Sequence, residues 1–346
     1  MSHPAAVPPW HWSALADTWT LEPLVAAVSV VLAAGYLAAA RRRRRTGGGS
    51  WPWHRTAPFL GGLAVWVWVT CSGLGVYERV LFTDRAVQVI LLLMFVPLLL
   101  VLGAPVTLLA EALAPAARDR LLAALRSRPS RVLMFPAVST VLLVAPPWLL
   151  YFTPWYERTL TSGVWNAGFH LVPVLLGLLY FWPRLQLDPV AHEYPLLLSV
   201  VITFVEVVFD AALALVLLYG GHLIAGPYYA SLGRTWGPSP ARDQFWGGNV
   251  IWVLGDLVGL PFLCALIRRL IVTGRAESAA VDAALDAAEA AEAARATAAA
   301  AARSAAGAGA ESGSDSGSDS VGREPEPAGA RPWWLDDPNL KHRYGG

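Results

Sequence analysis

The chain has 346 residues, of which 55% are hydrophobic and 15% are charged, and its formal net charge is +1. Soluble globular proteins carry about a quarter charged residues, so this composition excludes an ordinary soluble domain. The two cysteines, Cys71 and Cys264, stand in no CxxC or Cys/His spacing. The sequence therefore predicts neither a disulfide framework nor a zinc site.

A polar head rich in Trp and Pro occupies residues 1–22 and is predicted to be extracytoplasmic. No basic segment precedes the apolar run after it, so this run is interpreted as a retained helix and not a cleaved signal peptide. Further apolar runs of about 20 residues follow, and each can cross the hydrocarbon as a helix. The predicted fold class is all-α, a polytopic membrane protein with a seven-helix transmembrane domain over residues 23–272. Its predicted spans are residues 23–40, 57–77, 86–110, 132–152, 164–183, 196–220 and 246–270.

Arginines are concentrated in the loops on one side of this domain. The first span ends in five consecutive arginines, residues 41–45, which mark a cytoplasmic end under the positive-inside rule. Arg184 and the arginines of residues 118–131 and 268–275 are assigned to the same side. The N-terminus is therefore predicted outside and the C-terminus in the cytoplasm. Because topology accounts for the arginine run, the sequence gives no support for nucleic-acid binding.

The chain changes character twice after the last span. Residues 273–306 are rich in Ala with regularly spaced acids, which predicts a cytoplasmic helix. Residues 307–330 have low complexity and predict a disordered linker. Residues 331–346 form a tail peptide with two tryptophans. This tail is interpreted either as a docking peptide or as an aromatic pair on the membrane interface.

The sixth predicted span carries two carboxylates, Glu206 and Asp210, four residues apart and therefore on one helical face. A charge at the centre of a bilayer costs about 3 kcal/mol on insertion scales. Both side chains are expected to face the interior of the bundle and to have partners there, or else to be protonated.

Polar residues from the outer halves of neighbouring spans could supply those partners. This pattern predicts an intramembrane polar site open to the exterior. One interpretation is a site for a metal ion, a proton or a partner's prosthetic group, and the other is an ion pair that specifies helix packing. The candidates besides Glu206 and Asp210 are Arg85, Gln88, Asn166, His170, Asp243, Gln244 and Asp256.

Several stretches resemble the Caa3-type CtaG family of cytochrome c oxidase assembly factors. They are LLLMFVPLLLVLGAPVTLL in the third span, GLLYFWPRLQLDP at residues 177–189, DQFWGGNVIWVLGDL at residues 243–257, and the closing RPWWLDDPNLKHR, which is similar to the tail of actinobacterial members. The resemblance implies a multi-pass plasma-membrane protein that is needed to form an active haem–copper oxidase. It also implies oxidase subunits and the lipid bilayer as partners, and copper as a possible cofactor to be delivered.

The chain departs from the family's histidine pattern. Arg85 and Val89 stand where the resemblance implies histidines, and Asp210 aligns with a third. His170 lies near a histidine-bearing region, and Asn166 stands where another histidine could be. Imidazole suits copper, whereas carboxylates suit harder cations. An ion pair between Arg85 and Asp210 is therefore predicted in place of the metal, and an altered metal site with His170 and Asp210 as ligands is the alternative.

Three classes of function remain after these observations. The first is a membrane factor that assists assembly or copper loading of a cytochrome c oxidase, and the second is a scaffold for assembly that binds no metal. The third is a copper or proton transporter with an outward-facing polar site, which is disfavoured because the inner halves of the spans carry few charges. An enzyme is not expected, because no nucleophile–base pair and no HExxH or GxSxG motif occurs in a credible context. No span has the lysine that a retinal Schiff base requires.

Overall fold

The computed structural model of the protein describes residues 7–189 and 196–310. Within these ranges the secondary structure is helical and contains no strand. The elements are α1 (Ala14–Asp17), α2 (Pro23–Arg45), α3 (Trp53–Cys71), α4 (Gly73–Tyr77), α5 (Phe82–Ile90), the π-helical turn η1 (Leu91–Phe95), α6 (Val96–Leu102), α7 (Pro105–Ala112), α8 (Pro115–Leu125), α9 (Arg128–Leu133), α10 (Pro136–Phe152), α11 (Trp155–Thr161), α12 (Gly163–Leu185), α13 (Leu196–Tyr219), α14 (Gly226–Ser231) and α15 (Pro240–Ala310).

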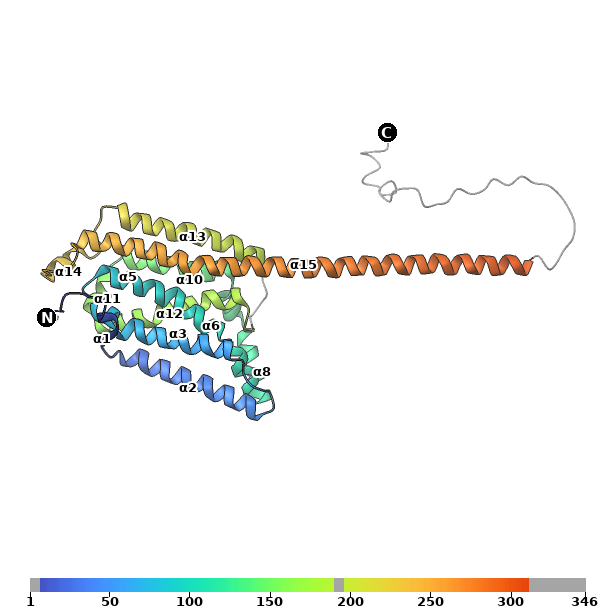
Figure 1. Ribbon diagram of the computed structural model, residues 1–346, viewed down its shortest axis with the longest axis horizontal. Coiled ribbons are helices and arrows are strands. Elements are labelled where there is room, and N and C mark those ends of the chain that lie inside the picture. Colours follow the sequence, from blue (N-terminus) through green and yellow to red (C-terminus); the bar gives the residue numbers. More distant parts are fainter. Residues whose placement is uncertain (1–6, 190–195, 311–346) are drawn as a thin grey trace, which may run out of the picture. The chain divides into compact units, whose positions relative to one another are not determined.

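The long helices of the first structural unit, residues 1–276, form a bundle (Figure 1). Helix α2 packs on α3, α3 on α6, α6 on α12, α12 on α10, and α10 on α13. We call the end of the bundle where α2 begins the Glu22 end, and the end where α2 finishes the Arg45 end. Helices α5, α12 and α15 also begin at the Glu22 end (Figure 1).

Six helical segments in the described part of the chain are long and apolar enough to cross a membrane. A seventh results if α10 and α11, which are bent by 72° to each other, count as one span. The all-α class and the membrane-spanning character are thereby confirmed, whereas the sidedness of the termini stays a prediction. The six segments are Pro23–Arg45, Trp53–Tyr77, Phe82–Ala112, Gly163–Leu185, Val200–Tyr219 and Pro240–Cys264.

The third segment is broken in two places. The π-helical turn η1 separates α5 from α6, and Ala104, with φ of 46°, separates α6 from α7. Asp188 caps the start of α7, because its carboxylate accepts the backbone N–H of Val106 (3.3 Å) and Thr107 (2.6 Å) and the hydroxyl of Thr107 (2.7 Å). These contacts satisfy backbone donors that a helix start leaves without intrahelical partners.

Helix α12 approaches the π-helical turn very closely at Gly177. A Cβ atom built on Gly177 would lie 2.1 Å from the carbonyl oxygen of Leu93 and 2.5 Å from Cγ of Pro97. Only glycine allows this approach, so the sequence places a glycine where α12 crosses the third segment. The crossing brings the polar face of α12 against α5 and α6.

The C-terminal unit, residues 277–346, contains the end of α15. The helix predicted over residues 273–306 is part of α15, which continues to Ala310. Side chains of residues 278–303 are exposed throughout. The first four residues of the predicted linker belong to α15, while the rest of it and the predicted tail peptide lie outside the described residues.

We predict that Gly177→Ala destabilises the protein by about 1 to 3 kcal/mol, because the added methyl group overpacks the crossing of α12 with the third segment. Thermal unfolding in one detergent measures the loss. Gly168→Ala is the matched control in the same helix, since a Cβ there meets nothing within 4 Å. Equal melting temperatures for the two variants would contradict the tight crossing.

Candidate functional site

Glu78 is the centre of a buried polar cluster at the Glu22 end. It follows α4, in the turn between the segments Trp53–Tyr77 and Phe82–Ala112, and its side chain is 3% exposed. Its carboxylate accepts hydrogen bonds from Gln88 Nε2 (2.9 Å) and Asn166 Nδ2 (2.5 Å). His170 Nε2 lies 2.9 Å and Arg85 Nη1 lies 3.6 Å from Glu78 Oε2. We call these five residues the Glu78 cluster.

Arg85 supplies the positive charge of this cluster. Its side chain is fully buried, and its guanidinium donates to Asn166 Oδ1 (2.7 Å) and Gln88 Oε1 (3.3 Å). The guanidinium also lies over the ring of Phe169, 4.5 Å from the ring centroid. The two amides each bridge Arg85 and Glu78, so the opposite charges are joined both directly and through neutral donors and acceptors.

His170 lies between two carboxylates. Its Nε2 donates to Glu78, and its Nδ1 lies 3.9 Å from Oε2 of Glu22, whose side chain is 24% exposed. No hydrogen-bond partner of Nδ1 occurs within residues 7–189 and 196–310. The indole of Trp66 donates to the backbone carbonyl of His170 (2.9 Å) and holds α12 against α3. His170 thus connects the buried cluster to the surface at the Glu22 end.

The Glu78 carboxylate carries its charge at every physiological pH. Burial acts to raise its pKa, but Arg85 and the hydrogen bonds from His170 and Gln88 outweigh burial and lower the pKa from 4.5 to about 2. A carboxylate with such a pKa is a poor general acid or base near neutral pH. Its chemistry is that of a permanent counter-ion for Arg85.

The structure therefore brings four of the predicted site residues together, namely Arg85, Gln88, Asn166 and His170. The predicted ion pair between Arg85 and Asp210 is wrong, because Arg85 is paired with Glu78. The turn after α4 places Glu78 beside the first turn of α5. Glu78 is therefore the counter-ion of Arg85, and Asp210 on α13 is not.

Glu206 has partners at a different level of the bundle. It accepts hydrogen bonds from the hydroxyl of Tyr180 and from Arg184 Nη2 (2.8 Å), both on α12. Arg184 also donates to Ser139 Oγ (2.9 Å) and Thr140 Oγ1 (2.7 Å) on α10. The expectation that Glu206 pairs with residues of the outer half is wrong, and so is the assignment of Arg184 to a loop. Arg184 is 1% exposed and is the buried counter-ion of Glu206.

Asp210 lies one turn after Glu206 on α13, and no hydrogen bond or ion pair among the described residues joins it to either cluster. It lines a cavity of about 10 Å³ together with Tyr151, which is room for about one water molecule. The Tyr151 hydroxyl has no hydrogen-bond partner within the described ranges. Asp256, on α15, forms no ion pair among the residues that the structure describes. His170 does not line this cavity, so the structure does not bring together the two predicted metal ligands, His170 and Asp210.

Asp243 and Gln244, at the start of α15, hold helix ends in place. Asp243 accepts the backbone N–H of Phe82 (2.9 Å) and Thr83 (3.1 Å) and the Thr83 hydroxyl (2.7 Å), so it caps α5 from another helix. Gln244 accepts the N–H of Ile224 (2.8 Å) and donates to the carbonyl of Leu217 in the last turn of α13 and to that of His222 in the α13–α14 connection. Their predicted place in a single polar site is wrong. Their hydrogen-bonding groups are used to position α5 and α14.

Sequence reasoning missed Glu78 and Arg184, which are the two counter-ions. Glu78 stands seven residues before Arg85, across a short connection, and this nearness of opposite charges was a signal for a local pair. Arg184 directly follows Pro183 and comes four residues after Tyr180. Tyr180 therefore lies on the same helical face, one turn earlier. A tyrosine and an arginine on one face of an apolar helix were the available signal that Arg184 points into the bundle.

Comparisons with known proteins give a consistent result. A family described as cytochrome c oxidase caa3 assembly factor (Caa3_CtaG) matches residues 34–273. Uncharacterized proteins of Mycobacterium bovis and Mycobacterium tuberculosis are each 32% identical over 257 residues, and one of Mycobacterium leprae is 31% identical over 257 residues. These matches cover 72% of this chain and 39% of each relative, so the chain spans about two fifths of their length. No solved structure matches significantly.

We predict that Glu78→Gln destabilises the protein by about 3 kcal/mol at pH 7, because it leaves Arg85 buried without a counter-ion. The folded-state pKa of Glu78 is depressed to about 2, so its stabilising contribution is complete above pH 4.5 and is lost as the pH falls toward 2. Unfolding measured across this range should show the difference between native and variant protein shrinking. Adding Arg85→Gln should recover part of the loss at pH 7, and strictly additive losses would contradict the pair.

We also predict that Asp243→Ala lowers stability by about 1 to 2 kcal/mol, because the donors at the start of α5 lose their acceptor. Denaturant unfolding in detergent measures this. Asp282→Ala, at an exposed position of α15, is the matched control and should change stability by less than about 0.5 kcal/mol. If both variants unfold alike, the capping role of Asp243 is refuted.

Proposed function

Because the chain belongs to the family of cytochrome c oxidase caa3 assembly factors, we propose that it assists assembly of a haem–copper oxidase as a membrane scaffold, with no copper ion in its Glu78 cluster. The role is non-catalytic and consists of protein–protein contact with oxidase subunits within the bilayer. The observation that carries this proposal is that Glu78 is paired with Arg85 and hydrogen-bonded by Gln88, Asn166 and His170.

Both oxygens of the Glu78 carboxylate already accept hydrogen bonds from the protein's own side chains. Arg85, Gln88, Asn166 and His170 approach it with N–H groups at 2.5 to 3.6 Å. A guanidinium already supplies the positive charge that a metal ion would bring. A second cation in this cluster would meet the charge of Arg85 and lose the hydrogen bonds of the two amides.

The residues present do not fit a copper site. Copper favours imidazole, thiolate and thioether ligands, and the cluster offers the single imidazole of His170, with Nε2 already used. Among the described residues no group of three or more His, Cys, Asp or Glu side chains is placed to hold a metal ion. The proposal therefore assigns no step of copper loading to these residues.

A transport role has less support than a scaffold role. Two buried carboxylates, Glu78 and Glu206, are tied to their own arginines. Apolar side chains of the third segment, including Leu92, Leu93 and Val96, are buried in the core that fills the bundle. A proton or ion path would need polar groups that can change partners, and ion pairs held by several hydrogen bonds favour one fixed arrangement instead.

The proposed topology is that of a multi-pass plasma-membrane protein with the Glu22 end outside and the Arg45 end in the cytoplasm. Residues 41, 42, 44 and 45, all arginines, are exposed at the Arg45 end. Exposed arginines next to a membrane span favour the cytoplasmic side. In this topology the C-terminal unit is cytoplasmic, and it can contact the cytoplasmic part of a partner.

Reduced-minus-oxidised haem spectra of membranes from a deletion strain test this function. We expect loss of the a-type haem signal, and no recovery on addition of excess copper to the growth medium. Glu78→Gln should fail to restore the signal, and Glu78→Gln with Arg85→Gln should restore most of it at equal protein levels by immunoblot. Recovery by copper alone would favour metal delivery, and an unchanged spectrum in the deletion strain would contradict an assembly role.

A further inference from the structure

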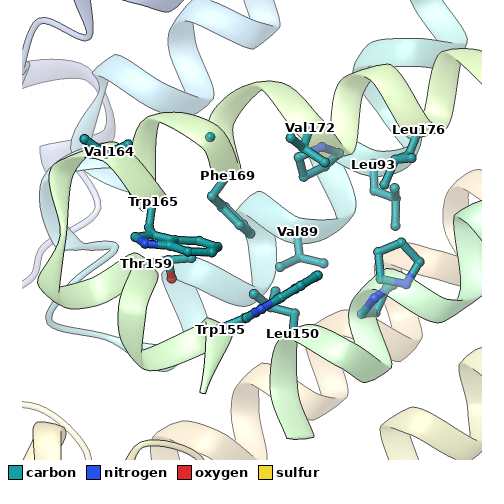
Figure 2. Close-up of a pocket in the computed structure, with 14 residues that line it drawn as sticks. Val89, Leu93, Leu150, Trp155, Thr159, Val164, Trp165, Phe169, Val172 and Leu176 are labelled. Carbon is teal, nitrogen blue, oxygen red and sulfur yellow. The ribbon is translucent and has the colours of Figure 1, made fainter. Parts of the chain in front are cut away.

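An apolar groove opens on the surface of the bundle between α10, α11 and α12 (Figure 2). Its volume is about 400 Å³, which is within the usual range for a small-molecule site. Val89 and Leu93 of the third segment form its floor, and Figure 2 shows Phe169, Leu150 and Val172 around the same space. No charged residue of the Glu78 cluster or of the Arg184–Glu206 pair lines the groove, and Val89, Leu93 and Pro147 lie between it and the cavity at Asp210, because they line both.

Helix-breaking residues produce this opening. Pro146 and Pro147 lie inside α10, and Pro173 lies inside α12. Gly168 adds no side chain, and a Cβ on it would meet nothing within 4 Å. Proline leaves a backbone carbonyl without its helical donor and bends the helix, so α10 and α12 do not close against each other here.

The lining determines what the groove can hold. The Thr159 hydroxyl donates to the carbonyl of Tyr156 (2.7 Å) and is therefore already used. The other lining side chains are hydrocarbon, apart from the indole N–H groups of Trp155 and Trp165. A polar ligand would lose its hydrogen bonds to water without replacing them, so the body of the ligand is a hydrocarbon.

The length of the groove matches one leaflet of a bilayer. It extends along α12 from Val164 to Leu176, which is about 18 Å at the rise of an α-helix. Half of the hydrocarbon thickness of a bilayer is about 15 Å. Trp155 and Trp165 are half-exposed at one end (Figure 2), and such rings favour the membrane–water interface.

A free cation stands at this interfacial end. Arg158, on α11, is exposed and lies 5.5 Å over the ring of Trp165. It forms no ion pair within the part of the chain that the structure describes. The 72° bend between α10 and α11 directs α11 away from the axis of α10. Arg158 thereby lies over Trp165, which lines the end of the groove. A phosphate would complement its charge there.

We propose that this groove binds one acyl chain of an anionic phospholipid, with the lipid phosphate at Arg158. The length of the groove, its hydrocarbon lining and the cation at its interfacial end together match an acyl chain joined to a phosphate, which supplies the counter-charge for Arg158. This site is independent of the proposed role in oxidase assembly.

Native mass spectrometry of the full chain in detergent tests the site. Delipidated protein is mixed with equal amounts of dioleoyl phosphatidylglycerol and dioleoyl phosphatidylcholine, and the bound lipid is identified from the mass of the complex. We expect one tightly held phosphatidylglycerol. Gly168→Leu and, independently, Val172→Phe fill the groove and should lower retention at least about tenfold. Gly61→Leu is the matched control, because a Cβ at Gly61 also meets nothing within 4 Å.

The rim is tested separately. Arg158→Gln should lower the preference for phosphatidylglycerol over phosphatidylcholine about fivefold, because one basic residue near an anionic lipid contributes about 1 kcal/mol. The adjacent change Glu157→Gln should not lower it. Equal lipid retention by the native protein and both groove-filling variants would overturn the proposal. So would the absence of bound lipid together with loss of oxidase-subunit binding in Gly168→Leu, which would assign the groove to a partner's helix.

Discussion

The structure depends on the rule that a charge buried in a low-dielectric interior needs a counter-charge. Arg85 and Arg184 are both fully buried, and each is paired with a carboxylate that is itself buried. Removing one member of such a pair leaves an uncompensated charge and costs several kcal/mol. The two pairs therefore act as fixed points: one joins the connection after α4 to α5 and α12, and the other joins α10, α12 and α13.

Helix α12 takes part in both fixed points. Asn166, His170, Tyr180 and Arg184 project from one face of it, together with Gly177, which permits close contact with the third segment. Residues on another face, among them Gly168, Val172 and Leu176, line the apolar groove. One face of the helix thus carries polar groups that hydrogen-bond to one another inside the bundle. Another face carries apolar side chains that line a groove on the surface of the bundle. This separation is consistent with a rigid scaffold that offers an outer surface to lipid.

The stretches that carry the family resemblance contain many of these structural ties. GLLYFWPRLQLDP contains the close-packed Gly177, the Glu206 partners Tyr180 and Arg184, and Asp188, which caps α7. DQFWGGNVIWVLGDL begins with Asp243 and Gln244, which hold the starts of α5 and α14. The hydrogen bonds of these polar side chains hold helices in place, so the same groups are not available to bind a ligand.

The sequence by itself determined the all-helical membrane fold, because length and hydropathy of a span are local properties that can be read along the chain. It also predicted that Arg85, Gln88, Asn166 and His170 share one polar region, since their depths follow from their distance to the span ends. Only the tertiary structure decided which charges meet. Pairing depends on the rotation of each helix about its axis and on the turn after α4, which brings Glu78 to Arg85, while Arg184 folds inward to Glu206. The sequence could not reveal the groove for the same reason, because it exists only where α10, α11 and α12 leave a space between them in the folded bundle.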